Sequence, residues 1–362
     1  MNNTIYPWQS SAWMQLQDMR ARLPHAILFH GEAGTGKADF IEAFAQALLC
    51  ENVKPDGFAC GTCVSCGWFA QHNHPDYRRV RPEALEDEMP AEGDDGGDTD
   101  TGKKRAAAGS AGPAKATKPP SKEIKIEQIR QLADFMNIST HRQGLRVVVL
   151  YPAEALNMPA SNALLKTLEE PPPGTVFLLS SNSLDRLLPT ILSRCRKFAL
   201  PMPDNAVALA WLKEQGLDDA DSWLREQGGS PLTALAQSEA GNREELETLL
   251  GFLARPGVEA ALKTADKLSK TPLGALVSWQ QRWLYDLVSY KLSGNIRYYP
   301  RYQKELAALA ATVHTAKLLL AIKSANERRA TADHPLSPKL FVEAMLLDYT
   351  ACCGLGSPLE RI

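Results

Sequence analysis

The sequence predicts an α/β fold in which a parallel β-sheet domain is followed by helices alone. Two apolar runs without alternation, residues 26–30 and 146–151, have the pattern of strands that are buried on both faces of a parallel sheet. Apolar stripes with helical spacing lie between these runs. From about residue 204 onward only helical patterns follow.

Length and charge limit the class of protein. The 362 residues are enough for two or three domains, each with its own core. The 40 basic and 42 acidic residues give a formal net charge of −2, so no general positive field attracts nucleic acid. The chain has no run of eighteen apolar residues and no secretory signal pattern at its beginning. We therefore expect a cytoplasmic protein.

A phosphate-binding loop follows the first predicted strand. Residues 31–37 fit the frame G-x-x-x-x-G-K between a strand and a helix. In such loops the backbone N–H groups and the lysine hold phosphates, and the next residue offers a hydroxyl to Mg²⁺. That next residue is Ala38, so the loop is degenerate and ATP binding is doubtful. The residues expected at the phosphates are Gly31, Gly34, Gly36 and Lys37.

Four of the seven cysteines, Cys50, Cys60, Cys63 and Cys66, have the spacing C-x₉-C-x₂-C-x₂-C. Two C-x₂-C steps place thiolates around one metal, and Cys50 completes a tetrahedral shell. A redox pair and buried thiols are alternatives, whereas an iron–sulfur cluster is disfavoured because no fourth cysteine followed by proline lies nearby. The pattern favours structural zinc in an inserted module at about residues 50–66.

The composition changes abruptly after this module. Residues 91–120 contain no Val, Ile, Leu or aromatic residue. Such a segment cannot bury enough apolar area to offset the entropy lost on ordering its backbone. We therefore predict a disordered insertion over about residues 82–122, inside the first domain.

The second predicted strand ends without the acids of an ATPase. In phosphate-loop ATPases such a strand ends in an Asp that holds Mg²⁺, near a group that orients water. Here Tyr151 and Pro152 stand at these positions, and Glu154 lies too far along the chain to be a confident substitute.

Three more segments carry a family resemblance. Residues 162–172, NALLKTLEEPP, predict a helix with a proline stop, and the strand TVFLLSSN and then LPTILSRC follow it. Together with HGEAGTGK, the four cysteines and HPDY, these motifs resemble the clamp-loader branch of the AAA+ ATPases. The resemblance covers residues 1 to about 240.

The resemblance implies an AAA+ domain at 1–202, a helical lid at 203–244 and an all-α collar at 245–362. It implies a hetero-oligomeric ring with gamma or tau motor subunits and a delta subunit, acting with a sliding clamp and primed DNA. No membrane partner is implied. The complex belongs to a DNA-directed DNA polymerase, whereas no ATPase activity is expected of the isolated chain.

The resemblance also assigns residues. Arg194, in the SRC motif, is expected to reach a neighbouring subunit's ATP site. Ser181 and Asn182 fall at the sensor 1 position, and Leu232 stands where the sensor 2 arginine is expected. Because groups for hydrolysis are missing from three motifs while the arginine is kept, a non-hydrolysing subunit that assists clamp loading is predicted.

The sequence leaves two alternative functions open. An autonomous AAA+ ATPase would need Mg²⁺ ligands that the motifs lack. A zinc-dependent nucleic-acid-binding protein would need basic and aromatic residues near the cysteines, for which Arg78, Arg79 and Arg81 are the nearest basic cluster.

Overall fold

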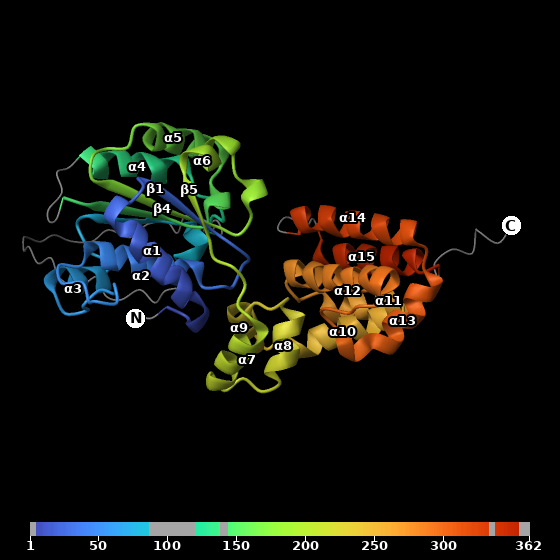
Figure 1. Ribbon diagram of the computed structural model, residues 1–362. Helices are drawn as coiled ribbons and strands as arrows, with labels where there is room; N and C mark the ends of the chain where they lie inside the picture. The colour runs from blue at the N-terminus through green and yellow to red at the C-terminus, as the bar shows by residue number, and fades with distance from the viewer. Residues whose placement is uncertain (1–4, 87–119, 138–143, 333–336, 355–362) are drawn as a thin grey trace, which may run out of the picture. The chain divides into compact units, whose positions relative to one another are not determined.

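The structure, a computed structural model, describes residues 5–86, 120–137, 144–332 and 337–354 (Figure 1). It divides into two compact units, Met1–Pro201 and Met202–Ile362. Unit 1 contains a five-stranded parallel sheet and unit 2 is helical, so the predicted α/β class is confirmed.

The sheet of unit 1 has the strand order β2-β3-β4-β1-β5, and its paired strands are all parallel. The strands are β1 (Ala26–His30), β2 (Tyr77–Val80), β3 (Arg146–Leu150), β4 (Thr175–Ser181) and β5 (Arg196–Ala199). The three central strands are almost wholly buried, as their unbroken apolar runs predict. The edge strands β2 and β5 each carry an exposed arginine, and the sequence has no apolar run at either strand.

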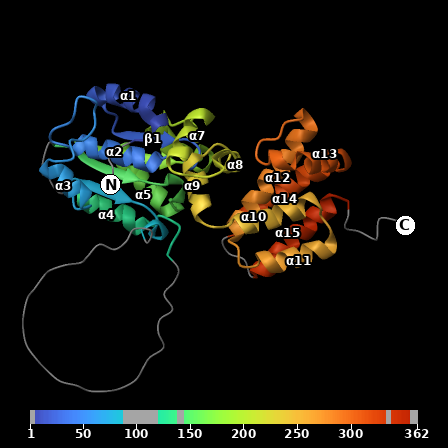
Figure 2. The ribbon, with the colours of Figure 1, turned by 90° about the horizontal axis from the view of Figure 1, so that it is seen from below.

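Helices cover both faces of this sheet, with α1 and α2 on one face and α4, α5 and α6 on the other (Figures 1 and 2). A hydrophobic core lies on each face of the sheet, and successive strand residues point into opposite cores. Phe29 packs with α1 and α2, whereas its neighbour Leu28 packs with α4 and α5. The helices of unit 1 are α1 (Ser10–Met19), α2 (Lys37–Leu49), α3 (Val64–Ala70), α4 (Ile126–Asn137), α5 (Met158–Glu169) and α6 (Pro189–Arg194).

Helix α5 forms as the motif NALLKTLEEPP predicts, but it begins earlier. The side chain of Asn157 caps it by accepting the N–H of Ala160 at 3.0 Å. It ends at Glu169, shortly before the proline run that starts at Pro171. The cap and the proline stop therefore fix the helix that carries Glu169.

The ends of the predicted insertion lie side by side. Ala84 N donates to Ser121 O at 3.0 Å, and Ser121 N donates to the Glu83 carboxylate at 3.1 Å. These flanking residues are ordered, although the predicted disordered range of about 82–122 included them. The remainder of that prediction, residues 87–119, lies outside the described residues.

The described residues of unit 2 form two hydrophobic clusters. The smaller joins α7, α8 and α9, and the larger joins the helices from α10 onward. In the larger cluster Trp283 donates to the hydroxyl of Tyr349, which donates to Leu253 O. The helices are α7 (Asn205–Glu214), α8 (Ala220–Glu226), α9 (Pro231–Glu239), α10 (Arg243–Ala254), α11 (Val258–Leu268), α12 (Leu273–Ser293), α13 (Gln303–Thr312), α14 (Thr315–Thr331) and α15 (Pro338–Cys352).

Among the described helices, none is by itself long and apolar enough to cross a membrane. One pair, Pro300–Thr312 and Thr315–Arg329, meets the criteria of length and composition together, with a bend of 115° between its members.

Candidate nucleotide and metal sites

The phosphate loop lies between β1 and α2, where the sequence predicts it. Two of its glycines are required by close contacts. A Cβ at Gly31 would lie 2.1 Å from Leu200 O, and a Cβ at Gly36, whose φ is +80°, would lie 2.4 Å from the Tyr6 ring. The backbone therefore has the compact shape that the glycine spacing predicts.

The chain segment before α1 covers this loop. Gln9 Nε2 donates to Thr35 O at 2.8 Å and to Gly36 O at 2.9 Å, and Trp8 Nε1 donates to Thr35 O at 3.0 Å. Gln9 is buried, and Tyr6 donates to Asp39 in the first turn of α2. The sequence analysis did not identify these contacts, because contacts across 26 or 27 residues leave no local pattern.

Lys37 is buried and already has a partner inside the loop. Its Nζ donates to Glu32 O at 2.6 Å, and only 5% of the residue is exposed. Burial lowers the pKa of Lys37 to about 8, against the opposing charges of Glu154 and Glu32. The lysine is thus held within the loop, where burial makes its charged form less stable than it would be in water.

Glu154 has a closer relation to this site than its sequence position suggests. Its Oε1 accepts the backbone N–H of Asn182 at 3.0 Å and the Asn182 side-chain amide at 2.9 Å. The charge of Glu154 also acts on Lys37. Strands β3 and β4 are neighbours in the sheet, so the residues that follow them meet at one edge. Asn182, at the expected sensor 1 position, and Glu154 therefore lie together beside the loop.

The pH dependence of stability tests this picture of Lys37. A lysine whose folded pKa is about 8, against 10.5 when unfolded, penalises folding below pH 8, and the penalty is relieved between pH 8 and 10.5. Between pH 7 and pH 10, wild type should gain about 2.5 kcal/mol of unfolding free energy relative to Lys37→Met, at 1.36 kcal/mol per pKa unit. Denaturant titrations of both proteins at both pH values measure this difference in unfolding free energy. A constant difference would contradict a buried lysine with a lowered pKa.

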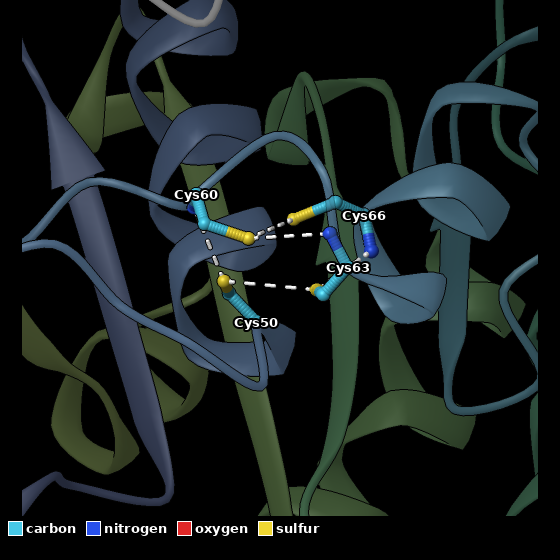
Figure 3. A group of neighbouring side chains, drawn as sticks. All are labelled: Cys50, Cys60, Cys63 and Cys66. Atoms are coloured by element: carbon cyan, nitrogen blue, oxygen red, sulfur yellow. Dashed lines mark hydrogen bonds between the residues drawn. The ribbon is translucent and has the colours of Figure 1, made fainter.

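The four predicted cysteines come together in one cluster (Figure 3). All four Sγ atoms lie within 4.8 Å of one another, with Cys50 to Cys63 and Cys60 to Cys66 each at 3.9 Å. A tetrahedron of thiolates at the usual Zn–S distance has edges of about 3.8 Å. The donor set and spacing therefore fit a tetrahedral ion such as zinc.

Backbone N–H groups surround the sulfurs. Cys60 Sγ accepts from the N–H groups of Thr62 and Cys63 at 3.4 and 3.3 Å, and these bonds lower the pKa of the Cys60 thiol to about 6. Burial raises the pKa of Cys50 and Cys66. A buried thiol with a raised pKa loses its proton readily only when a cation lies beside it. A bound metal ion would be that cation for Cys50 and Cys66.

Arg194 ends helix α6 at the surface of unit 1. Its guanidinium donates to Thr190 O at 2.9 Å and forms an ion pair with Glu169 on α5. The Arg194 side chain is 31% exposed and that of Glu169 is 50% exposed. Glu169 is a contact of the candidate arginine that the sequence analysis did not identify, since 25 residues separate the two.

The basic cluster considered for nucleic acid is engaged within unit 1. Arg79 pairs with Glu42 at 3.8 Å, and Arg78 lies over the Phe135 ring at 4.4 Å. Arg81 is only 8% exposed. These contacts of the three arginines give no support to a nucleic-acid site beside the cysteines.

Leu232, at the expected sensor 2 position, lies on α9 in unit 2.

The parallel sheet, with the phosphate loop between β1 and α2, defines an α/β domain of the phosphate-loop type that the motifs indicate. Residues 8–204 match the family described as "DNA polymerase III, delta subunit". The chain belongs to the family of DNA polymerase III delta' subunits.

Three relatives show how far this similarity extends. The chain is 33% identical to the DNA polymerase III subunit delta' of Pseudomonas aeruginosa, over 97% of this chain and 99% of the relative. It is 31% identical to that of Escherichia coli over 69% and 65% of the two chains. It is 29% identical to that of Haemophilus influenzae over 80% and 78%.

Proposed function

We propose that this chain is a non-hydrolysing subunit of a clamp loader, which assists ATP-dependent loading of the sliding clamp onto primed DNA. Its contribution to catalysis is Arg194, offered to the ATP site of a neighbouring subunit. The observation that carries the proposal is an asymmetry: this chain lacks the groups for hydrolysis at its own loop, yet it presents an arginine at its surface.

The chain's own loop is poorly suited to hydrolysis. Ala38 offers no hydroxyl to Mg²⁺, and β3 is followed by Tyr151 and Pro152 instead of acids. Lys37 is committed to Glu32 O within the loop. A nucleotide would have to displace that contact and would still find no ligand for its metal in these motifs.

Arg194 is available to a neighbour despite its ion pair. An exchange of partners costs little, because an ion pair between groups this exposed contributes at most about 1 kcal/mol. A γ-phosphate carries more negative charge than Glu169, and the planar guanidinium can bind it through two N–H groups. Thr190 O meanwhile orients the guanidinium from within α6.

The partners follow from the family. The relatives are subunits of DNA polymerase III, and the chain also matches a subunit tau from Bacillus subtilis, at 25% identity over 71% of this chain. We place this chain in a hetero-oligomeric ring beside gamma or tau motor subunits and a delta subunit. Contact with the sliding clamp and primed DNA is made through that ring.

One structural zinc ion belongs to the proposal. Cys50, Cys60, Cys63 and Cys66 would hold it, and all four ligand positions would be filled by protein. Such a closed shell suits bracing of the inserted module and leaves no open position for chemistry.

Nucleotide binding by the isolated chain tests the non-hydrolysing role. Titration with ATP, with and without Mg²⁺, is expected to show no Mg²⁺-dependent gain in affinity and no turnover, because the metal ligands are missing. Ala38→Thr restores one hydroxyl and serves as the matched comparison, also expected to be inactive. Mg²⁺-dependent ATP hydrolysis by the wild-type chain would instead support an autonomous ATPase.

A further inference from the structure

A buried chain of hydrogen bonds connects the cysteine cluster to the body of unit 1. From its geometry we propose that His74 is a positioning residue of the metal site. Acting through Ser65, it holds helix α3 against the end of α2. This inference rests on the metal binding proposed above.

The hydrogen bonds connect Asp76, which immediately precedes β2, to Leu49 at the end of α2. Asp76 N donates to His74 Nδ1 at 3.1 Å, and His74 Nε2 lies 2.7 Å from Ser65 Oγ. Ser65 Oγ donates to Leu49 O at 2.5 Å. Ser65 is 1% exposed, and His74 and Asp76 are each 2% exposed, so water cannot replace a broken link.

The direction of each bond follows from its neighbours. Nδ1 of His74 accepts an amide N–H, so in the neutral ring the proton lies on Nε2. Nε2 therefore donates to Ser65 Oγ, whose own hydrogen goes to Leu49 O. The ring is held as a neutral donor, and the Ser65 hydroxyl is used both as donor and as acceptor.

The anchored atoms stand next to the metal ligands. Leu49 immediately precedes Cys50, and Ser65 lies on α3 between Cys63, which caps that helix, and Cys66. The bond between Ser65 and Leu49 thus joins the two segments that carry three of the four thiols. His74 fixes the orientation of the hydroxyl that makes this bond.

The same residues do not form a nucleophilic triad. Ser65, His74 and Asp76 are the residue types of one, but the Ser65 proton points to Leu49 O and the hydroxyl is buried. Asp76 contacts His74 through its backbone N–H. The arrangement holds two helices in register and has no accessible nucleophile.

Two substitutions at His74 separate its two bonds. The Asn side chain in His74→Asn can accept the Asp76 N–H but is too short to donate to Ser65, whereas His74→Gln can donate to Ser65. Ser65→Ala removes the link altogether. Ser161→Ala, a buried serine on α5 away from the cluster, is the matched control.

The test measures zinc release from the full-length protein to a chromophoric chelator, beside the absorption spectrum of the Co²⁺-substituted protein. Changing an outer partner of a metal ligand typically lowers metal affinity by about 10-fold to 100-fold. We expect His74→Asn and Ser65→Ala to release zinc about 10-fold faster than wild type, with altered Co²⁺ bands. His74→Gln should release zinc more slowly than His74→Asn, and Ser161→Ala should match wild type.

Wild-type release rates and spectra in His74→Asn and Ser65→Ala, with zinc bound to wild type, would overturn the inference. An equal acceleration in Ser161→Ala would do the same, because it would assign the effect to general loosening. If His74→Asn fails to fold, the Ser65→Ala result decides alone. A wild-type protein that binds no zinc would overturn the metal proposal and this inference together.

Discussion

Arg194→Ala is expected to leave the reconstituted clamp loader assembled while it lowers ATP hydrolysis at the neighbouring subunit's site by about 10³-fold. Arginines inserted across interfaces in GTPases contribute about 10³ to 10⁵ to the rate, because they neutralise charge on the transferring phosphoryl group. ATP hydrolysis stimulated by clamp and primed DNA, and clamp loading itself, measure the effect. Assembly is checked by size-exclusion chromatography of the same complexes.

Two matched variants separate charge from geometry. Arg194→Lys should recover little activity, because lysine restores the charge without the two parallel N–H donors. Arg196→Ala removes an exposed arginine two residues away on β5 and should behave as wild type. Equal losses in the Arg194 and Arg196 variants would indicate a general electrostatic effect of this surface and not a placed guanidinium.

Removal of zinc is expected to have the largest effect on stability. A ligand that binds only the folded state at 1,000 times its Kd stabilises it by about 4 kcal/mol. A loss of 1 kcal/mol lowers the Tm of a unit of this size by about 2 to 4 °C. Cys66→Ser removes one ligand of the zinc site and should therefore lower the Tm by about 10 °C. Calorimetry with metal analysis of the same samples measures both quantities.

The control for that prediction is a cysteine outside the cluster. Cys352→Ser changes a half-buried thiol at the end of α15 and should keep one zinc per chain and the wild-type response to chelator. Wild-type protein purified without chelator and found free of zinc would contradict the assignment, whatever the variants do.

The sequence predicts the central sheet and the clusters whose members are close in the chain. Strands β1, β3 and β4 are visible as apolar runs because both of their faces are buried. The edge strands β2 and β5 are not, since each has an exposed side and is stabilised by pairing with a neighbour. The cysteine spacing predicts the metal cluster, because all four ligands lie within seventeen residues.

Contacts between distant segments could not be predicted in this way. Gln9 reaches the phosphate loop across 26 residues, and Asn182 reaches Glu154 across 28. The second pair is a consequence of strand order, because β3 and β4 are adjacent and their carboxyl ends share one edge. The position of Glu154 along the chain therefore does not reveal that it lies beside Asn182.

The most direct test of the central claim is single-turnover ATP hydrolysis by a reconstituted ring in which only the motor subunit beside this chain keeps a competent ATP site. In that ring every productive event depends on the one interface that Arg194 is proposed to enter. We expect Arg194→Ala to lower the single-turnover rate by about 10³-fold while ATP remains bound. An unchanged rate, in a ring shown to contain the variant chain, would contradict it.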